Sequence, residues 1–261
     1  MVDTFANVSK EDSITLIHLN HPPANTLSSA SIEHLRVIFK ELAEDEETRA
    51  IIVTGSGRFF AAGADIKEFV AAFGQQDRAL QMAEAGQALC DEIEAMKKPV
   101  IAAINGPALG GGLELALGCH FRIASSNAIV GLPELKLGLL PTFGGTQRLS
   151  RITTQAKALQ LILTSQQLSA DEALQLGIIQ VVTEPDELLP TAKALAQSFV
   201  EGKSMTSVSR TIECIIQGGK NHLQKGLELE RTRFAELFLT ADAREGVQAF
   251  IDKRQPNFKH S

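Results

Sequence analysis

The first two thirds of the chain alternate short apolar runs with stretches in which apolar residues recur every three or four positions. Short apolar runs are typical of buried strands, and the three-to-four spacing is typical of amphipathic helices. The pattern predicts strands over residues 13–19, 50–54 and 100–104, and helices over residues 28–42 and 80–96. Strands that alternate with helices along a chain indicate the α/β class.

Capping signals mark two further helices. Asp65 can cap a helix that starts directly after it, because its carboxylate can accept a backbone N–H of the first turn. Ser169 and Glu172 have the spacing of a capping box, and Gly177 ends the short helix that the box opens. The apolar run that follows, residues 178–182, is predicted to be a buried strand.

The last quarter of the chain has a different pattern. Strand signals disappear from residue 204 to residue 254, and every segment there has helical periodicity. We therefore expect a core over residues 1–200 and a helical region over residues 201–261.

Composition excludes several classes of protein. The chain has 44% apolar residues, enough to bury a full core, and 25 Lys and Arg against 31 Asp and Glu give a net charge of −6. A nucleic-acid-binding face is not expected, because the chain is acidic and has no Tyr or Trp. No apolar segment approaches the roughly 20 residues that span a bilayer. Cys90, Cys119 and Cys214 are odd in number and widely spaced, which favours free thiols in the cytoplasm.

A glycine cluster is the first candidate for chemistry. Residues 103–117 contain a strand end, a turn at Asn105, three glycines at 110–112 and a helix start with Glu114. Such an arrangement aims backbone N–H groups at an anion or a carbonyl oxygen. It indicates an oxyanion hole with an acid/base beside it. The alternative is that the glycines only allow close packing of the helix on the strand.

Counting excludes two nucleotide-binding motifs in this cluster. A dinucleotide fingerprint that starts at Gly110 needs glycine at position 115, where Leu115 stands. A phosphate-binding loop that starts at Gly106 needs lysine at position 112, where Gly112 stands.

Glu134 is a second candidate carboxylate, 20 residues after Glu114. It lies between Pro133 and Leu135, and partial desolvation there would raise its pKa and suit it to hold or donate a proton. The alternative is an ordinary solvated loop glutamate.

A loop of small residues is the third candidate. Residues 61–64 are Ala, Ala, Gly and Ala, so that a ligand can approach the main chain. If the Ala64 N–H faces that of Gly111, two donors converge on one oxygen, the geometry that stabilises an enolate. By itself the segment would be only a capped helix start.

Together these elements resemble the enoyl-CoA hydratase/isomerase family, the crotonase superfamily. The matching segments are residues 22–27, 61–67, 101–115, 131–149, 169–178 and 244–258. The resemblance implies an α/β fold, a crotonase-like spiral of ββα units, followed by a C-terminal helical region that assembles a homotrimer or a hexamer as a dimer of trimers. It also implies an acyl-CoA thioester substrate.

The resemblance further implies roles for individual residues. Ala64 and Gly111 would supply the oxyanion N–H groups, and Glu114 and Glu134 would be the catalytic glutamates. The substrate-binding candidates are Ala62, Ala64, Asp65, Ile66, Lys67, Gly111 and Lys253, with Arg58 as a further candidate for the coenzyme A phosphates.

The implied activity is hydration of a trans-2-enoyl-CoA to a 3-hydroxyacyl-CoA, in fatty acid β-oxidation or a related acyl-CoA degradation. No metal or separate cofactor is expected, because the histidines lack ligand spacing and coenzyme A is part of the substrate. The alternatives are an enoyl-CoA isomerase, or a hydrolase or decarboxylase, of the same superfamily, an RNA-binding relative, and a catalytically inactive scaffold. Thr142 and Phe143 lie near the expected acyl path and leave the chain length open.

Overall fold

A six-stranded sheet forms the centre of the computed structural model, which describes residues 5–260. In sheet order its strands are β1 (Ala6–Glu11), β2 (Ile14–Leu19), β3 (Ala50–Gly55), β4 (Val100–Ile104), β6 (Phe121–Ser125) and β9 (Val181–Thr183). β1 is antiparallel to β2, and the other pairs are parallel. β3 and β4 are buried on both faces, so they are apolar throughout rather than alternating.

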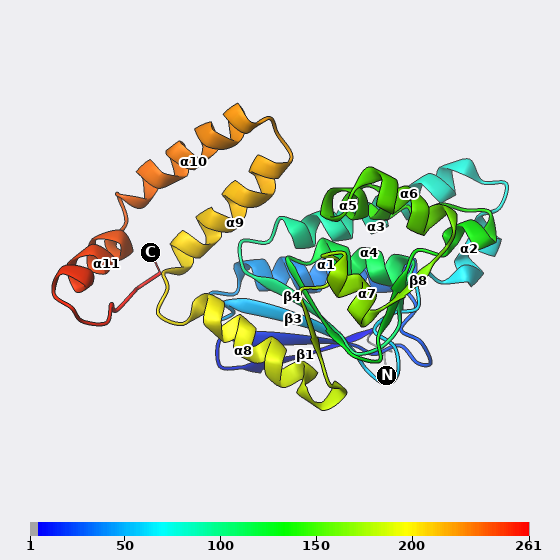
Figure 1. Cartoon of the computed structure of the whole chain (residues 1–261), viewed down its shortest axis with the longest axis horizontal. Coiled ribbons are helices and arrows are strands. Elements are labelled where there is room, and N and C mark those ends of the chain that lie inside the picture. The colour runs from blue at the N-terminus through cyan, green and yellow to red at the C-terminus, as the bar shows by residue number, and fades with distance from the viewer. Residues whose placement is uncertain (1–4, 261) are drawn as a thin grey trace.

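Helices cover both faces of this sheet (Figure 1). Ile51 and Val53 pack in one core cluster with residues of α1 (Ser29–Glu44), α3 (Gln76–Glu94) and α4 (Gly111–Gly118). Ile52, between them in β3, points to the other face and packs against α8 (Leu188–Val200). The two core layers therefore follow directly from the alternation of side chains along the strands.

A smaller layer, built on a three-stranded sheet, lies beside the six-stranded sheet. Its strands are β5 (Ala108–Leu109), β7 (Ile129–Gly131) and β8 (Gln167–Ser169). The shorter helices are α2 (Ile66–Ala72), η1 (Glu134–Leu137), α5 (Gly145–Ile152), α6 (Gln155–Leu163), α7 (Ala170–Gln175) and η2 (Pro185–Glu187), and of these α7 contacts β7 and β8. Because β5 follows β4 after one turn and leads into α4, this layer meets the main sheet at the glycine cluster.

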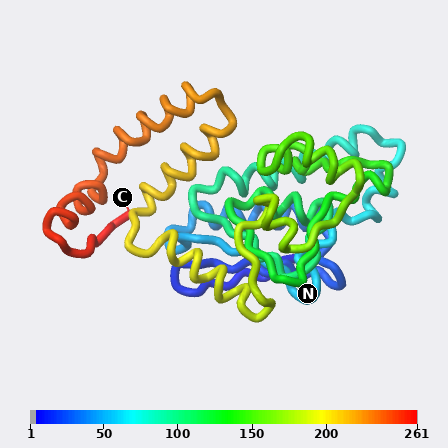
Figure 2. Tube along the Cα trace, in the orientation of Figure 1, coloured from blue at the N-terminus to red at the C-terminus, as the bar shows by residue number. Residues whose placement is uncertain are grey.

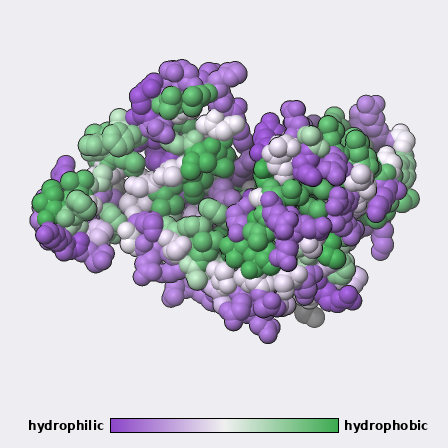
Figure 3. Space-filling view, in the orientation of Figure 1, coloured by the Kyte–Doolittle hydropathy of each residue, from purple (hydrophilic) through white to green (hydrophobic). Residues whose placement is uncertain are grey.

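The three last helices form an arm that extends away from the sheets (Figures 1 and 2). The arm consists of α9 (Met205–Gly219), α10 (Leu223–Leu237) and α11 (Ala241–Ile251). α9 and α10 contain no buried residue, although both carry large apolar side chains. Figure 3 shows apolar side chains at the surface of the arm.

Most predicted elements are present. The α/β class is confirmed, and β2, β3 and β4 agree with the predicted strands to within one residue. Ser28 and Asp65 cap α1 and α2, and the capping box of Ser169 and Glu172 is complete. No helix within residues 5–260 is both long and apolar enough to cross a membrane.

Two predictions need correction. α3 begins at Gln76, four residues before the predicted start, and ends at Glu94. The predicted strand over residues 178–182 is wrong in its first half, because β9 begins only at Val181. Ile178 and Ile179 are buried in a turn, where both N–H groups donate to the carbonyl of Ala173. An apolar run shows burial but does not distinguish a strand from a buried turn.

Candidate active site

A cavity of about 350 Å³ brings together the three segments that the sequence singles out. Ala62 and Ala64 line it from the small-residue loop, Gly111 and Glu114 from the start of α4, and Glu134 from η1. These segments are far apart in the sequence and meet where the smaller layer joins the main sheet.

The loop before α2 presents the Ala64 N–H to this cavity. Leu27 holds the loop from both sides of Ala64, because its N–H donates to the Gly63 carbonyl and its carbonyl accepts the Asp65 N–H. The N–H of Ala64 between them has no hydrogen-bond partner in the described part of the chain. A donor that is fixed in this way, and left free, is available to a ligand.

The Gly111 N–H lies beside it. Gly110 has φ of +53°, a left-handed conformation that turns the chain sharply into α4, and its N–H donates to the Gly131 carbonyl. Gly111 is the first residue of α4, so its N–H has no partner within the helix. A Cβ added at Gly111 would lie 3.4 Å from the Ala64 nitrogen. The two free donors are therefore close enough to share one oxygen.

Glu114 lies in the first turn of α4 and is 2% exposed. Its Oε1 accepts the Gly145 N–H at 2.7 Å. The pKa of Glu114 is raised to about 8, because burial, with the charge of Glu134, outweighs the opposing N–H of Gly145 and charge of Arg148. A carboxyl group with such a pKa exchanges protons near neutral pH.

Glu134 begins η1 and is half-buried. Its Oε2 is buried and has no hydrogen-bond partner among the described residues, and burial raises the pKa of this carboxyl as well. A Cβ added at Gly110 would lie 2.8 Å from Glu134 Oε1, so only glycine leaves room for this carboxyl at the start of α4. The cavity thus holds two carboxyl groups that both favour a proton.

The rest of the cavity wall is apolar. Its large side chains are Ile66, Phe69, Phe73, Met82, Leu137, Leu139, Leu140 and Phe143. The Phe143 ring lies directly over Gly86 of α3, where an added Cβ would be 2.1 Å from a ring carbon. Thr142 also lines the cavity, and its carbonyl accepts a hydrogen bond from the Gln87 side chain. Thr142 and Phe143 therefore both belong to the wall of the cavity.

Not every predicted binding residue reaches the cavity. Ile66 lines it, but the Asp65 carboxylate turns back to accept the Lys67 N–H at 3.0 Å. Lys67 and Arg58 are exposed near the loop. Lys253 follows α11 at the end of the arm, away from α2 (Figure 1).

The described residues contain no group of three or more His, Cys, Asp or Glu side chains that could hold a metal ion.

Sequence reasoning missed the residues that anchor the turn whose Gly145 N–H donates to Glu114. Arg148 of α5 is 9% exposed and donates to the Phe143 carbonyl, and its ion pair with Asp91 connects α5 to α3. The sequence shows only an arginine one turn after a glycine pair. An arginine on an amphipathic helix is usually solvent-exposed, so this position did not indicate a buried anchor.

Comparison with known proteins agrees with this geometry. The family model Enoyl-CoA hydratase/isomerase matches residues 9–261. A Bacillus subtilis protein described as a probable enoyl-CoA hydratase is 47% identical over 247 residues, which cover 94% of this chain and 95% of that protein. The short-chain-enoyl-CoA hydratase of Clostridium acetobutylicum is 40% identical over 250 residues, with 95% of each chain covered.

A solved structure is also similar along the whole length. The enoyl-CoA hydratase of Bacillus anthracis has a TM-score of 0.92 and 36% identity to this chain, and the match covers 98% of this chain and 100% of that one. The arm is thus part of the similarity.

Proposed function

This chain belongs to the enoyl-CoA hydratase/isomerase family, and from that premise we propose which of its residues carry out the reaction. It is an enoyl-CoA hydratase, a hydro-lyase that adds water across the 2,3 double bond of a trans-2-enoyl-CoA to give a 3-hydroxyacyl-CoA. The observation that supports the residue assignment best is the pair of carboxyl groups, buried Glu114 and half-buried Glu134, in one cavity with two N–H groups that have no partner among the described residues.

The N–H groups of Ala64 and Gly111 bind the thioester oxygen. Attack on Cβ moves negative charge onto this oxygen, and two preorganised donors stabilise that charge more strongly than the neutral carbonyl. Removal of one such donor raises the barrier by about 3–4 kcal/mol. Both donors belong to the main chain, so their position depends on the loop before α2 and the turn at Gly110.

Glu114 is the general base and Glu134 the general acid. The Gly145 N–H and the Arg148 charge favour the ionised form of Glu114 against the burial that raises its pKa to about 8, so its ionised fraction acts as the base, while Glu134 Oε2 has no hydrogen-bond partner among the described residues. Glu114 takes a proton from water while the water oxygen forms a bond to Cβ. Glu134 gives its own proton to Cα. Transfer of the proton from Glu114 back to Glu134 then restores the pair.

The two carboxyl groups also discriminate between the activities of the family. Movement of a double bond requires one group that removes a proton and returns it elsewhere. Addition of water requires a base for the water and an acid for Cα at the same time. Two carboxyls in one cavity therefore favour hydration over isomerisation.

Hydration of crotonyl-CoA by the purified protein tests the assignment. We expect the wild type to form 3-hydroxybutyryl-CoA, identified by mass, and Glu114→Gln and Glu134→Gln each to lower kcat by about 10²–10⁴-fold with the fold retained. Near-normal turnover by either variant would remove that residue from the mechanism. A longer enoyl-CoA assayed in parallel shows whether the apolar wall favours more than a short chain.

Assembly into a homotrimer, or a hexamer built as a dimer of trimers, is part of the proposal. The arm supports it, because α9 and α10 bury no residue within the chain and expose large apolar side chains. We propose residues 1–200 as the catalytic core and residues 201–261 as the oligomerisation region. A cytoplasmic location is supported by Cys90, Cys119 and Cys214, which are all free thiols.

A further inference from the structure

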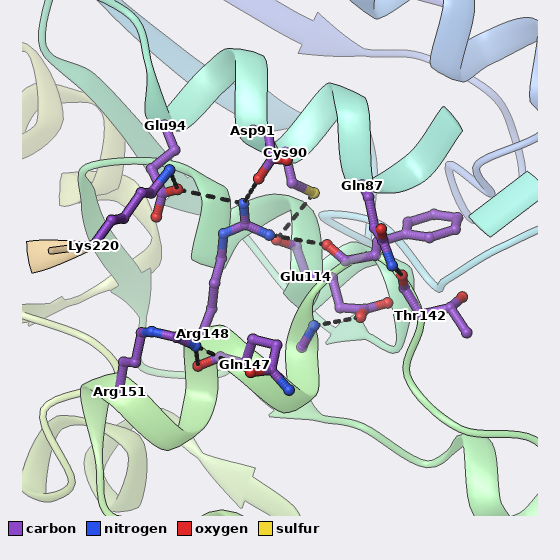
Figure 4. A network of polar contacts seen from close by, with 12 residues as sticks. Gln87, Cys90, Asp91, Glu94, Glu114, Thr142, Gln147, Arg148, Arg151 and Lys220 are labelled. Atoms are coloured by element: carbon purple, nitrogen blue, oxygen red, sulfur yellow. Dashed lines mark hydrogen bonds and ion pairs between the residues drawn. The ribbon is translucent and has the colours of Figure 1, made fainter. Parts of the chain in front are cut away.

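Arg148 lies behind the base, on the side of α5 that faces α3. Its guanidinium donates to the Phe143 carbonyl at 3.0 Å through Nη1 and to Asp91 Oδ1 at 2.5 Å through Nη2. Glu94 lies 3.5 Å from the same nitrogen. Figure 4 shows the guanidinium between the acidic side chains of α3 and the turn before α5, whose Gly145 N–H donates to Glu114. An arginine fork that binds at two ends fixes the distance between them.

The turn before α5 is enclosed between this guanidinium and the Glu114 carboxylate. A Cβ added at Gly144 would lie 2.1 Å from Arg148 Nη1, and one added at Gly145 would lie 2.7 Å from Glu114 Oε1. Gly144 also has φ of +102°, which side chains rarely adopt. The two glycines therefore allow the main chain to contact a cation on one side and the catalytic carboxylate on the other.

We propose that Arg148 is a positioning residue for the base: it anchors the Phe143–Gly145 turn to α3, so that the Gly145 N–H stays on Glu114 Oε1. The inference rests on the proposed function, because it needs Glu114 as the base. It adds a residue that does not line the cavity and that acts on Glu114 through the main chain of the turn and through its charge.

The charged groups around Glu114 determine the direction in which loss of Arg148 shifts the pKa of the base. Glu114 faces Glu134 of η1, Arg148 of α5, and Cys90 of α3, whose thiol donates to the Glu114 carbonyl. Arg148 in turn faces Cys90, Asp91 and Glu94 of α3. Glu94 also forms an ion pair at 2.6 Å with Lys220, which directly follows α9. Arg148 is the cation that lowers the pKa of Glu114, and the Gly145 N–H that it positions lowers this pKa too. Loss of Arg148 therefore raises the pH at which the base ionises.

The test compares pH profiles of kcat for hydration of crotonyl-CoA. For Arg148→Gln we expect kcat to fall about 10–100-fold, KM to change less than kcat, and the acid limb to move to higher pH by roughly half to one unit. Arg148→Lys keeps the charge but not the fork. Its acid limb should stay near the pH of the wild-type limb, and its kcat should fall almost as far as that of Arg148→Gln.

Arg151→Gln is the matched control. Arg151 lies on the same helix, is exposed, and donates to the Gln147 carbonyl, away from the turn. Its loss changes the net charge equally and should leave both kcat and the acid limb unchanged. If Arg148→Gln does not fold, Asp91→Asn replaces it: Asp91 is exposed at 65% and holds the other end of the fork. The same shift, of smaller size, is expected.

The outcomes separate this inference from the proposed function. If Glu114→Gln retains the acid limb, Glu114 is not the base and the inference fails with the assignment. A second outcome is that Glu114→Gln loses the acid limb of the kcat profile, while folded Arg148→Gln keeps the acid limb and the kcat of the wild type. Glu114 is then confirmed as the base, and the positioning role of Arg148 is wrong. A lower melting temperature of Arg148→Gln with unchanged kcat and limb would likewise reduce Arg148 to a structural role.

Discussion

Glu114 is a residue whose burial opposes folding as the pH rises. Its pKa is about 8 in the folded chain and near 4.5 when solvated. Between these values the folded state holds a proton that the unfolded state has lost. The free energy of unfolding therefore falls as pH rises from about 4.5 to about 8, and no further cost is added above pH 8. A catalytic carboxyl in a dry cavity reduces stability in this window.

Glu114→Gln should remove this cost, because the amide stays neutral and its oxygen still accepts the Gly145 N–H. We expect the apparent Tm of the variant to exceed that of the wild type by at least about 2–4 °C at pH 8, the effect of roughly 1 kcal/mol in a chain of this size. The difference should shrink at pH 5. Thermal unfolding of both proteins across this range checks the sign, and an equal difference at both pH values would contradict it.

A buried asparagine outside the loop that carries Ala64 holds the first part of that loop. Asn25 is 2% exposed and its Nδ2 donates to the carbonyls of Ser56, Phe59 and Phe60 at 2.9–3.2 Å. Its own φ is +51°, a conformation that asparagine tolerates better than most residues. The position of the oxyanion donor at Ala64 thus depends on a side chain that never contacts substrate.

Asn25→Ala should affect both stability and rate. Loss of these hydrogen bonds should lower the free energy of unfolding by about 2–3 kcal/mol. A displacement of the Ala64 N–H by about 1 Å should lower kcat up to about 10²-fold. Denaturant unfolding and hydration kinetics measure the two effects. Thr26→Ala, which removes only a 3.4 Å contact with His21, should change neither.

The elements that could be predicted have a local pattern in the sequence, and those that were missed have none. β3 and β4 are predictable because both faces are buried, and the helix caps because a cap is a local hydrogen bond. β1 carries five exposed residues of six, so its edge position leaves no apolar pattern. At the site, the carboxyls and glycines are visible as residue types. The Arg148 to Asp91 pair is not, because it joins residues 57 apart through the tertiary fold.

At the scale of the whole molecule, the arm requires a partner surface. Phe238 and Leu239, in the turn after α10, are exposed at 70% and 88%, and Phe250 of α11 is exposed at 84%. An isolated helical arm of this kind gains little from its own packing, and large exposed apolar patches mark protein interfaces. The arm should therefore gain stability from assembly, and the Tm should rise with protein concentration.

Leu239→Asp and Phe250→Asp test this, because a charge at the centre of an apolar interface leaves it unpaired and desolvated. We expect a trimer or hexamer for the wild type and a smaller species for each variant by light scattering. Val8→Asp, at an apolar position exposed at 48% on β1, should keep the wild-type mass. The dissociated variants should also lose the dependence of Tm on concentration. A monomeric wild type would contradict the proposed oligomerisation region, and its arm would then have to be stabilised by Lys220–Glu94 and the few other contacts with the core.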